Sequence, residues 1–267
     1  MNRTEAISII TVTRNARCSL LRSMGSVRIQ TGTVAHVIID GASTDGTAEM
    51  LRTEAPRLAW WCSEPDDGIA DAFNKGLRHV AGDIIGILNA DDWYESHALA
   101  AIRRVFAETD AEVVHGRVRY WQDGVPIRIA DGDHRALRRA GSVNHPSVFV
   151  RREVYQRLGS FDPSYRYAMD YEIMLRWLVA GVRFRYLPMV LANMSLGGVS
   201  DRCRPEALRE VRRAQRLHLG RTTADAQYLW LLGRFRARQA CDRLGLQRLV
   251  SWQRARNRGM RSVTALP

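Results

Sequence analysis

The sequence predicts an α/β fold in which a mostly parallel sheet is covered by helices on both faces. Short apolar, β-branched runs alternate with stretches of helical periodicity through residues 6–106. The apolar runs are nearly unbroken, as expected for strands that are buried on both faces. Each run ends in polar or glycine residues, as strands do where they leave a sheet. Repeated strand–helix units of this length predict parallel strands joined by right-handed crossovers.

Four such strands are expected in the first half of the chain. They lie at residues 6–13 (AISIITVT), 35–40 (AHVIID), 58–62 (LAWWC) and 84–88 (IIGIL). Helices are expected between them because apolar residues recur every three or four positions. These residues are Leu20, Leu21 and Met24, then Met50 and Leu51, then Ile69, Phe73, Leu77 and Val80.

The second half is predicted to be mixed rather than purely parallel. After a helix at residues 97–106, residues 112–121 alternate apolar and polar side chains, and Asp123 and Gly124 turn the chain into residues 125–130. This pattern is typical of a hairpin. The remaining expected elements are a strand at 145–150, helices at 153–158 and 171–179, and strands at 184–187 and 189–196.

Composition limits the class of protein. The chain has 267 residues, of which 46% are hydrophobic, enough for one sizeable core or one core with an appendage. Its four cysteines show no CxxC spacing, which argues against a zinc site or a disulfide framework and favours a reducing compartment. The first residues lack the pattern of a secretory signal, and no apolar run reaches the roughly 18 residues of a membrane span. We therefore expect a cytoplasmic protein.

The positive charge is concentrated at the end of the chain. Residues 1–200 hold 24 Lys+Arg and 23 Asp+Glu, whereas residues 201–267 hold 16 and 5, so the second part carries +11 of the net +12. Arg alternates there with Leu, Trp and Tyr at helical spacing, as in helices that lie on an anionic membrane. We expect peripheral attachment to the inner face of the cell membrane. A solvated helical face and a docking surface for a partner protein are alternatives, and nucleic acid is disfavoured because residues 1–200 are nearly neutral.

Two adjacent acids follow the fourth strand in residues 82–95, which read GDIIGILNADDWYE. In an open α/β sheet, ligands bind beyond the carboxyl ends of the strands, and the pair Asp91 and Asp92 suits a hard divalent cation that holds a diphosphate. The alternative is that Asp92 or Ser96 only caps a helix that begins near Glu95.

Four segments resemble the successive blocks of bacterial family 2 glycosyltransferases, which are inverting, metal-dependent enzymes of the GT-A fold. The segments are ISIITVTRN, then VIIDGASTDGT, then EPDDGIADAFNKG with GDIIGILNADDWY, then HPSVFVRREVYQRLGSFDPSYRYAMDYEIMLRW. Each block alone is common, but four in this order are specific. The resemblance covers about residues 6–200 and is closest to members that build cell-surface polysaccharides or glycolipids.

The resemblance implies the domain organisation and the reaction. A GT-A domain would occupy residues 1–200, with a nucleotide-sugar half at 1–95 and an acceptor half at 96–200, followed by a basic helical extension at 201–267. The enzyme would move a sugar from a nucleotide-sugar, usually a UDP-sugar, to a hydroxyl of a lipid-linked or oligosaccharide acceptor. The expected cofactor is Mg or Mn.

The family holds the nucleotide at the ends of its first two strands. The matching residues here are Thr13, Asn15 and Asp40, and the Asp40 carboxylate can accept the imide N–H of uracil. Alternatively, Asp40 opens a turn with Ser43. The tyrosine that the family has after the first-strand threonine is Arg14 here, which leaves base stacking open, although a guanidinium can stack on a planar ring.

The metal block departs from the family pattern Asp-x-Asp-Asp, because its first position is Asn89. By position, Asp91 is the expected metal ligand, with Asp92 beside it and Asn89 able to bind the ribose. A neutral first position is compatible with a metal, which needs only one or two carboxylates in addition to substrate phosphates.

The preceding helix carries Asp71, Asn74 and Lys75, the chain's one lysine. The family often has a basic residue there, so the resemblance implies contacts with the donor. An ordinary solvated helix face is the alternative.

The resemblance makes Asp170 the general base, with Met169 in place of the family's usual glutamate. A single carboxylate that faces the acceptor hydroxyl is what an inverting displacement needs. Asp170 can instead be the N-cap of the following helix, and Glu172 with Arg176 can be a simple helix ion pair. His145 is expected to line the acceptor site, with a core histidine as the alternative.

Two other classes of protein stay open. A sugar-nucleotide pyrophosphorylase needs a glycine-rich phosphate loop after its first strand, and TRNARCSLL is a poor version of one. A non-catalytic nucleotide-sugar-binding or scaffold protein of a polysaccharide assembly complex is the other alternative. The presence of both Asp91 and Asp170 argues against it.

Overall fold

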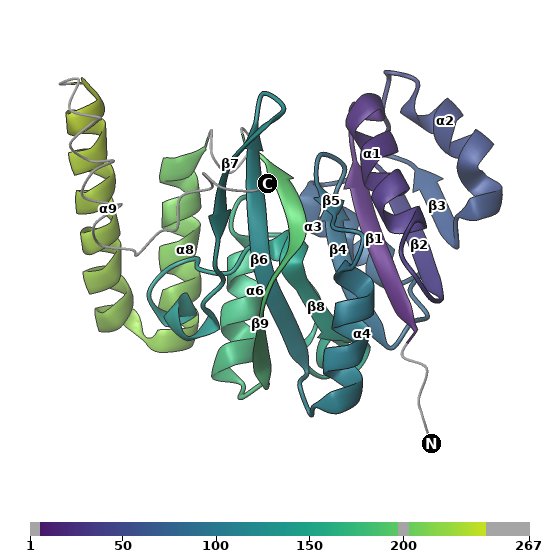
Figure 1. Ribbon diagram of the computed structural model, residues 1–267. Helices are drawn as coiled ribbons and strands as arrows, with labels where there is room; N and C mark the ends of the chain where they lie inside the picture. Colours follow the sequence, from purple (N-terminus) through teal and green to yellow (C-terminus); the bar gives the residue numbers. More distant parts are fainter. Residues whose placement is uncertain (1–5, 197–202, 244–267) are drawn as a thin grey trace, which may run out of the picture.

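The structure, a computed structural model, describes residues 6–196 and 203–243 as one sheet flanked by helices (Figure 1). The strands are β1 (Ile7–Thr13), β2 (Val34–Asp40), β3 (Trp60–Ser63), β4 (Ile84–Asn89), β5 (Trp93–Tyr94), β6 (Val113–Gln122), β7 (Val125–Ala130), β8 (Val148–Arg151) and β9 (Phe184–Ser195). The helices are α1 (Arg17–Arg28), α2 (Thr47–Glu54), α3 (Ile69–Leu77), α4 (Ala98–Glu108), α5 (Arg152–Leu158), α6 (Met169–Val179), α8 (Arg204–Leu219) and α9 (Arg221–Arg243). Short 3-10 helices lie at Ala55–Arg57, His134–Arg138 and His145–Ser147.

The strand order confirms the predicted fold class. The sheet runs β3-β2-β1-β4-β8-β6-β9-β5, and β7 pairs with β6 alone. The first four of these strands are parallel neighbours, as their buried apolar runs predict. The second half is mixed, because β8 is antiparallel to both of its neighbours whereas β9 is parallel to β6. The hairpin of β6 and β7 forms around Asp123 and Gly124, which both have positive φ.

The register of the parallel strands brings their carboxyl ends to one edge of the sheet. Thr13 at the end of β1 pairs with Asp40 at the end of β2, and Val12 pairs with Asn89 at the end of β4. The loops that follow these strands therefore meet at that edge.

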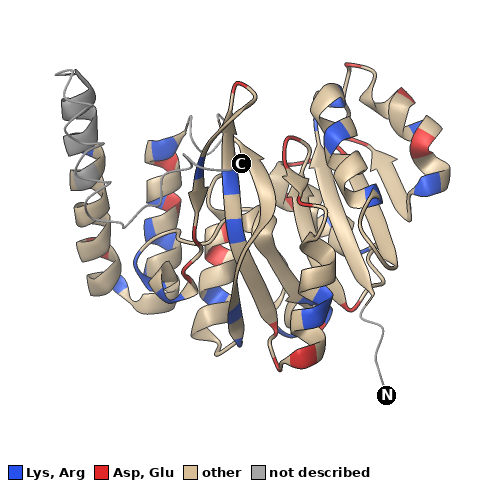
Figure 2. Ribbon diagram, viewed as in Figure 1, with Lys and Arg blue, Asp and Glu red and all other residues tan. Residues whose placement is uncertain are grey.

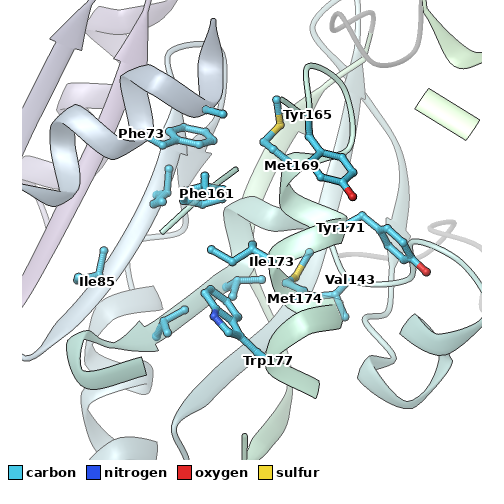
Figure 3. Packing of buried hydrophobic residues seen from close by; sticks show 14 of the residues in the cluster. Phe73, Ile85, Val143, Phe161, Tyr165, Met169, Tyr171, Ile173, Met174 and Trp177 are labelled. Carbon is cyan, nitrogen blue, oxygen red and sulfur yellow. The ribbon is translucent and has the colours of Figure 1, made fainter. Parts of the chain in front are cut away.

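The two faces of the sheet form two cores. On one face, α3, α5 and α6 pack against alternate residues of β1, β2 and β4, including Ile10, Val12 and Ile85. Figure 3 shows the part of this core that surrounds α6, where Trp177 and Ile173 are almost completely buried. On the other face, α4 packs against Ile7 and Ile9. Each fully buried aliphatic or aromatic side chain contributes roughly 1.5–3 kcal/mol to stability.

Two of the predicted strands differ most from their expected bounds, and the short strand β5 was not predicted. Pro146 lies in the 3-10 helix His145–Ser147, so β8 begins only at Val148, because proline lacks the N–H that a sheet ladder needs. The two strands expected at 184–187 and 189–196 are one long strand, β9, whose pairing with β6 shifts register between His115 and Val118.

The first helix of the predicted extension, α8, packs against α6 (Figure 1). Ala214 and Gln215 are completely buried there. The next helix, α9, is joined to α8 by ion pairs from Arg212 and Arg216 to Asp225, each at 2.7 Å. The boundary predicted after residue 200 falls between β9 and α8, and residues 201–202 and 244–267 of the extension lie outside the described residues. Within the described part of the chain, no helix combines the length and the apolarity that crossing a bilayer requires.

Candidate active site

Asn15 joins the loops that follow β1 and β2. Its backbone N–H donates to Ser43 Oγ at 2.7 Å, and its side-chain Oδ1 accepts from the backbone N–H of Thr44 at 2.8 Å. Asn15 has φ +50°, a conformation that asparagine tolerates better than most residues. The hydroxyl of Thr13 is buried beside these loops and has no hydrogen-bond partner among the described residues. Both predicted donor residues therefore lie at the edge of the sheet where a ligand is expected.

Asp40 is buried beneath the same loops. It is 0% exposed, and its carboxylate accepts hydrogen bonds from Ser43 N at 3.1 Å, from Ser63 Oγ at 2.6 Å and from Ser43 Oγ. This is the turn arrangement that the sequence left as an alternative to uracil binding. In this conformation Asp40 fixes the loops after β2 and β3, and a contact with a base would need Ser43 to move.

A second carboxylate, that of Asp66, is half-buried and lies next to Gly41, the residue that follows Asp40. A methyl group added to Gly41 would overlap Asp66 Oδ2 and would lie 3.5 Å from the Cδ atom of Arg14. The other Asp66 oxygen, Oδ1, accepts from Gly68 N at 2.9 Å. Asp66 and Arg14 therefore meet over the Gly41 backbone, where a base or ribose can contact both. Asp66 belongs to the EPDDG segment, in which no donor-binding residue was predicted.

The three predicted donor residues on α3 hold neighbouring loops. Lys75 Nζ donates to the Pro65 carbonyl at 2.7 Å and pairs with Glu64 at 2.8 Å and with Asp71 at 3.6 Å. Asn74 makes two hydrogen bonds with the backbone of Phe161, one through its amide nitrogen at 2.8 Å and one through its oxygen at 3.0 Å. Lys75 thus fixes the loop that carries Asp66, while Asn74 ties α3 to the segment before α6.

The two acids after β4 have different environments. Asp92 is 2% exposed, and its oxygens accept from Ser195 N and Asn89 Nδ2, both at 3.3 Å. Burial, and then the nearby Asp91 charge, raise the pKa of Asp92 well above its usual range. Asp91 is half-buried, and burial raises its pKa despite the hydrogen bond from its own amide and the charge of Arg22. Neither Asp92 nor Ser96 caps α4, whose N-cap is His97.

The residues present fit a metal ion through one carboxylate. Among the described residues, no three His, Cys, Asp or Glu side chains are grouped as a metal cage. The half-buried Asp91 carboxylate accepts no hydrogen bond from another described residue, although the Asp91 backbone carbonyl accepts one from Ser195 Oγ at 3.0 Å. Both carboxylate oxygens of Asp92, in contrast, already have partners. A Mg or Mn ion held by one carboxylate, substrate phosphates and water requires no more than this. Asp91 is the fitting ligand, and Asp92 lies behind it.

The two acids of the MDYE segment, Asp170 and Glu172, differ in their interaction partners. Glu172 is 3% exposed and accepts from Arg176 at 2.9 and 3.1 Å and from His218 at 2.9 Å. Burial tends to raise the pKa of Glu172, but the hydrogen bonds from His218 and Arg176 outweigh it and lower that pKa. Asp170 has no cationic partner among the described residues, and burial raises its pKa. It is the second residue of α6, not its N-cap.

Asp170 lines a small cavity between α6 and the sheet. The cavity has a volume of about 10 Å³, and Asp170, His145, Trp177 and Ile87 of β4 are among its lining residues. This space suffices for about one water molecule. The base candidate therefore lines the same cavity as Ile87 of β4, which precedes Asp91 by four residues in the sequence.

His145 is half-buried and lines the same small cavity as Asp170. Its ring stacks on Phe73 with 5.2 Å between centroids, and its Nε2 atom is buried without a partner among the described residues. Burial lowers the pKa of His145 to about 4, so its ring is neutral at physiological pH. The stacking on Phe73 agrees with the alternative of a core histidine, and an acceptor contact stays a prediction.

Comparison with known proteins places the chain in a family. Residues 8–162 match glycosyl transferase family 2. The chain belongs to this family. It is therefore a glycosyltransferase, as the resemblance in the sequence predicted. An uncharacterized glycosyltransferase of Mycobacterium tuberculosis is 29% identical over 235 residues, covering 82% of this chain and 86% of the relative. A PGL/p-HBAD biosynthesis glycosyltransferase of the same species is 29% identical over 203 residues, covering 73% and 78%.

Solved structures show the same GT-A fold. Staphylococcus aureus TarS 1–349 in complex with UDP-GlcNAc has a TM-score of 0.65 at 15% identity, covering 85% of this chain and 72% of that chain. The mannosyltransferase PcManGT from Pyrobaculum calidifontis, in complex with GDP-Man and Mn²⁺, has a TM-score of 0.62 at 21% identity, covering 86% and 79%. At these identities the likeness establishes the fold.

Proposed function

We propose that this glycosyltransferase moves a sugar from a UDP-sugar to a hydroxyl of a lipid-linked or polysaccharide-precursor acceptor, with inversion at the anomeric carbon. The observation that carries the proposal is the Asp170 carboxylate. It is half-buried at the start of α6, has no cationic partner among the described residues, and has a pKa that burial raises. A carboxylate of this kind is a better base than an ion-paired one.

The Asp170 carboxylate has one oxygen available for the reaction. Oδ1 accepts the backbone N–H of Tyr171 at 2.7 Å, which orients the group and leaves Oδ2 for the acceptor. Asp170 Oδ2 takes the hydroxyl proton as the acceptor oxygen bonds to the anomeric carbon and the bond from that carbon to the diphosphate breaks. The nucleoside diphosphate leaves, and Asp170 returns its proton to solvent. Attack opposite the leaving group inverts the configuration.

On the donor side, Asp91 would hold Mg or Mn, which neutralises charge on the departing diphosphate when bound. Asn15, Ser43 and Asp40 shape the loops around the nucleotide, and Asp66 and Arg14 flank the place for its base or ribose. The neighbour bound to UDP-GlcNAc supports a UDP-sugar, and the neighbour bound to GDP-Man and Mn²⁺ supports a divalent metal and requires that GDP-sugars be tested as well. The relative from PGL/p-HBAD biosynthesis supports a biosynthetic acceptor.

The test is the release of nucleoside diphosphate from a panel of UDP- and GDP-sugars, with Mn²⁺, Mg²⁺ or chelator, in the presence of a lipid extract. Wild type should turn over one UDP-sugar in a metal-dependent way, Asp91→Ala should lose this activity, and Asp170→Asn should bind the donor but transfer no sugar. Asp123→Asn is the matched control, because Asp123 lies at the hairpin tip with φ +50°, which asparagine also adopts. Absence of donor binding and turnover by wild type would leave the chain as a binding or scaffold protein.

We also propose that the basic helices attach the enzyme to the inner face of the cell membrane. Leu217, Leu229 and Trp230 are exposed by 69%, 67% and 55%, on helices that also carry exposed arginines (Figure 2). Apolar side chains among basic ones suit an anionic lipid surface.

Substitution tests this attachment better than truncation, because a deletion from residue 201 would also remove buried Ala214 and Gln215. The double variant Leu217→Ser, Leu229→Ser should sediment less with phosphatidylglycerol vesicles than wild type. Leu21→Ser is the matched control, since Leu21 is 52% exposed on α1. Equal sedimentation of the double variant and wild type would refute attachment through these helices.

A further inference from the structure

The start of α6 is capped by a side chain from a distant helix. Glu210 of α8 accepts three consecutive backbone N–H groups: Arg166 N at 2.9 Å, Tyr167 N at 2.8 Å and Ala168 N at 2.9 Å. The N-cap residue of α6 is Ala168, which has no side chain able to cap the helix. A negative charge at a helix N-terminus is favourable, and hydrogen bonds to a carboxylate are stronger than those between neutral groups.

Other side chains of α8 hold the segments on either side of Asp170. Before it, the Arg213 guanidinium lies 3.7 Å from the ring centroid of Tyr165. After it, Gln215 donates to the Tyr171 hydroxyl at 2.9 Å. From Glu210 to His218, α8 covers about 12 Å at 1.5 Å per residue, so one rigid helix contacts α6 over two turns. Tyr165, Tyr171 and Met169 are seen together at the start of α6 in Figure 3.

Without Glu210, the three amides would lack their acceptor. The nearest carboxylate along the chain is that of Asp170, which already accepts the Tyr171 amide. A first-turn acid can rotate to satisfy free amides at its own helix N-terminus. In that position Asp170 would have no oxygen left for an acceptor hydroxyl.

We propose that Glu210 is a positioning residue for sugar transfer: by satisfying the amides of residues 166–168, it keeps one Asp170 oxygen free for the acceptor. The inference rests on the proposed role of Asp170 as the base. It also gives α8 a part in the reaction, in addition to any attachment that it provides.

The test compares Glu210→Gln with Glu206→Gln. Glutamine keeps the size of Glu210 but directs an NH₂ group at backbone donors. Glu206 lies one turn earlier on α8 and pairs only loosely with Arg209, at 3.5 Å, so it is the matched control. Glu210→Gln should lower kcat at least about tenfold, because small displacements of a catalytic group have large effects, while the donor KM changes less than about threefold. Glu206→Gln should match wild type, and Glu210→Asp, which keeps the charge on a shorter side chain, should fall between wild type and Glu210→Gln.

Two further measurements separate positioning from general damage. Hydrogen exchange at the amides of residues 166–168 should be faster in Glu210→Gln and unchanged in Glu206→Gln. The titratable groups that face Asp170 are Glu210 from α8, and His145 and Tyr155 across the small cavity. Because the Glu210 charge contributes to the raised pKa of Asp170, the acid limb of the kcat profile should move to lower pH in Glu210→Gln.

Each outcome supports or overturns the positioning role of Glu210. Active wild type with equally active Glu210→Gln overturns the positioning role and leaves the proposed function intact. A lower kcat together with an equally raised donor KM, with unchanged hydrogen exchange at the amides of residues 166–168, also overturns the positioning role. The damage to the site is then general. If wild type itself neither binds nor turns over a donor, the proposed function and this inference both fail.

Discussion

Glutamine and asparagine substitutions at Glu172 and Asp170 should separate stability from catalysis. Glu172 is almost fully buried between Arg176 and His218, whereas Asp170 has no cationic partner among the described residues. Glu172→Gln should therefore destabilise the protein and leave kcat within about threefold of wild type. Asp170→Asn should leave the stability nearly unchanged and reduce kcat by roughly 10²–10⁴, as expected for loss of a general base.

The size of the Glu172 effect follows from its partners. Removing one partner of a fully buried ion pair costs about 3–5 kcal/mol. Here Arg176 is 22% exposed and keeps hydrogen bonds to the carbonyls of Leu158 at 2.6 Å and Ser160 at 2.8 Å. His218 is 14% exposed. We therefore expect a loss at the lower end, about 2–3 kcal/mol, which corresponds to a fall in Tm of roughly 5–10 °C for a domain of this size.

The pH dependence has a definite sign. The pKa of Glu172 is lower in the folded than in the unfolded state, so its contribution to stability is present above the unfolded pKa, about 4.3. That contribution is lost as the pH falls through the folded pKa. The difference in unfolding free energy between wild type and Glu172→Gln should therefore be full at pH 7 and shrink below about pH 4.

Urea unfolding at pH 7 and at acid pH, with steady-state kinetics on the same samples, checks both halves of the prediction. A Glu172→Gln variant with wild-type stability and a kcat as low as that of Asp170→Asn would refute the reasoning. Glu172 would then be the base, and the ion pair with Arg176 would be incidental.

Three further predictions concern the donor site and the core. Gly41→Ala should displace Asp66 and weaken donor binding about tenfold, or about 1.4 kcal/mol, in a calorimetric titration, with a stability change of about 1 kcal/mol or less; unaltered binding would exclude a donor role for Asp66. Asp91→Ala should lower metal-dependent turnover at least about a hundredfold, and the residual rate should no longer respond to chelator; a variant as metal-dependent as wild type would show that the ligand lies elsewhere. Burial lowers the pKa of His36 to about 4, so its contribution to stability, up to about 3 kcal/mol, should be lost as the pH falls from about 6.5 to 4, and urea unfolding of His36→Gln should lack that slope; the same slope in both proteins would contradict this assignment.

The parallel half of the sheet was predictable because its signals are local. Each of the strands β1, β2 and β4 is an apolar run that ends in polar residues, and their parallel direction follows from the repeated strand–helix unit. β9 was harder, because its two apolar runs become one strand only by pairing with β6 across a register shift. That pairing joins residues about 70 positions apart and leaves no trace in local periodicity.

In the candidate site, too, some residues were predictable from local sequence and others depend on tertiary contacts. Asp91 and Asp170 were predicted as site residues from their places in short motifs, and both are half-buried in the structure. The turn between Asp40 and Ser43 was one of two alternatives from the sequence, but the hydrogen bond from Ser63 of the next strand, which also holds Asp40, was not predictable. No role for Asp66 was predicted because EPDDG contains two adjacent acids, Asp66 and Asp67. Only the close approach of Gly41 to Asp66 in the structure distinguishes them. The sequence identifies which residue types are present, whereas tertiary contacts decide which of them face a ligand.

The C-terminal extension shows the limit of charge counting. A net charge of +11 over residues 201–267 suggests a surface for anionic lipid, but the sum ignores which charges have internal partners. Glu210 and Asp225 are among the few acids there; one caps α6, and the other binds Arg212 and Arg216. Two of the described acids in this basic segment therefore make specific contacts between elements, which a sum of charges does not reveal. By this reasoning, Glu210→Gln should impair transfer in detergent solution without any membrane, whereas Leu217→Ser with Leu229→Ser should impair only transfer that depends on vesicles. If both variants were impaired only in the presence of vesicles, α8 would act through attachment alone.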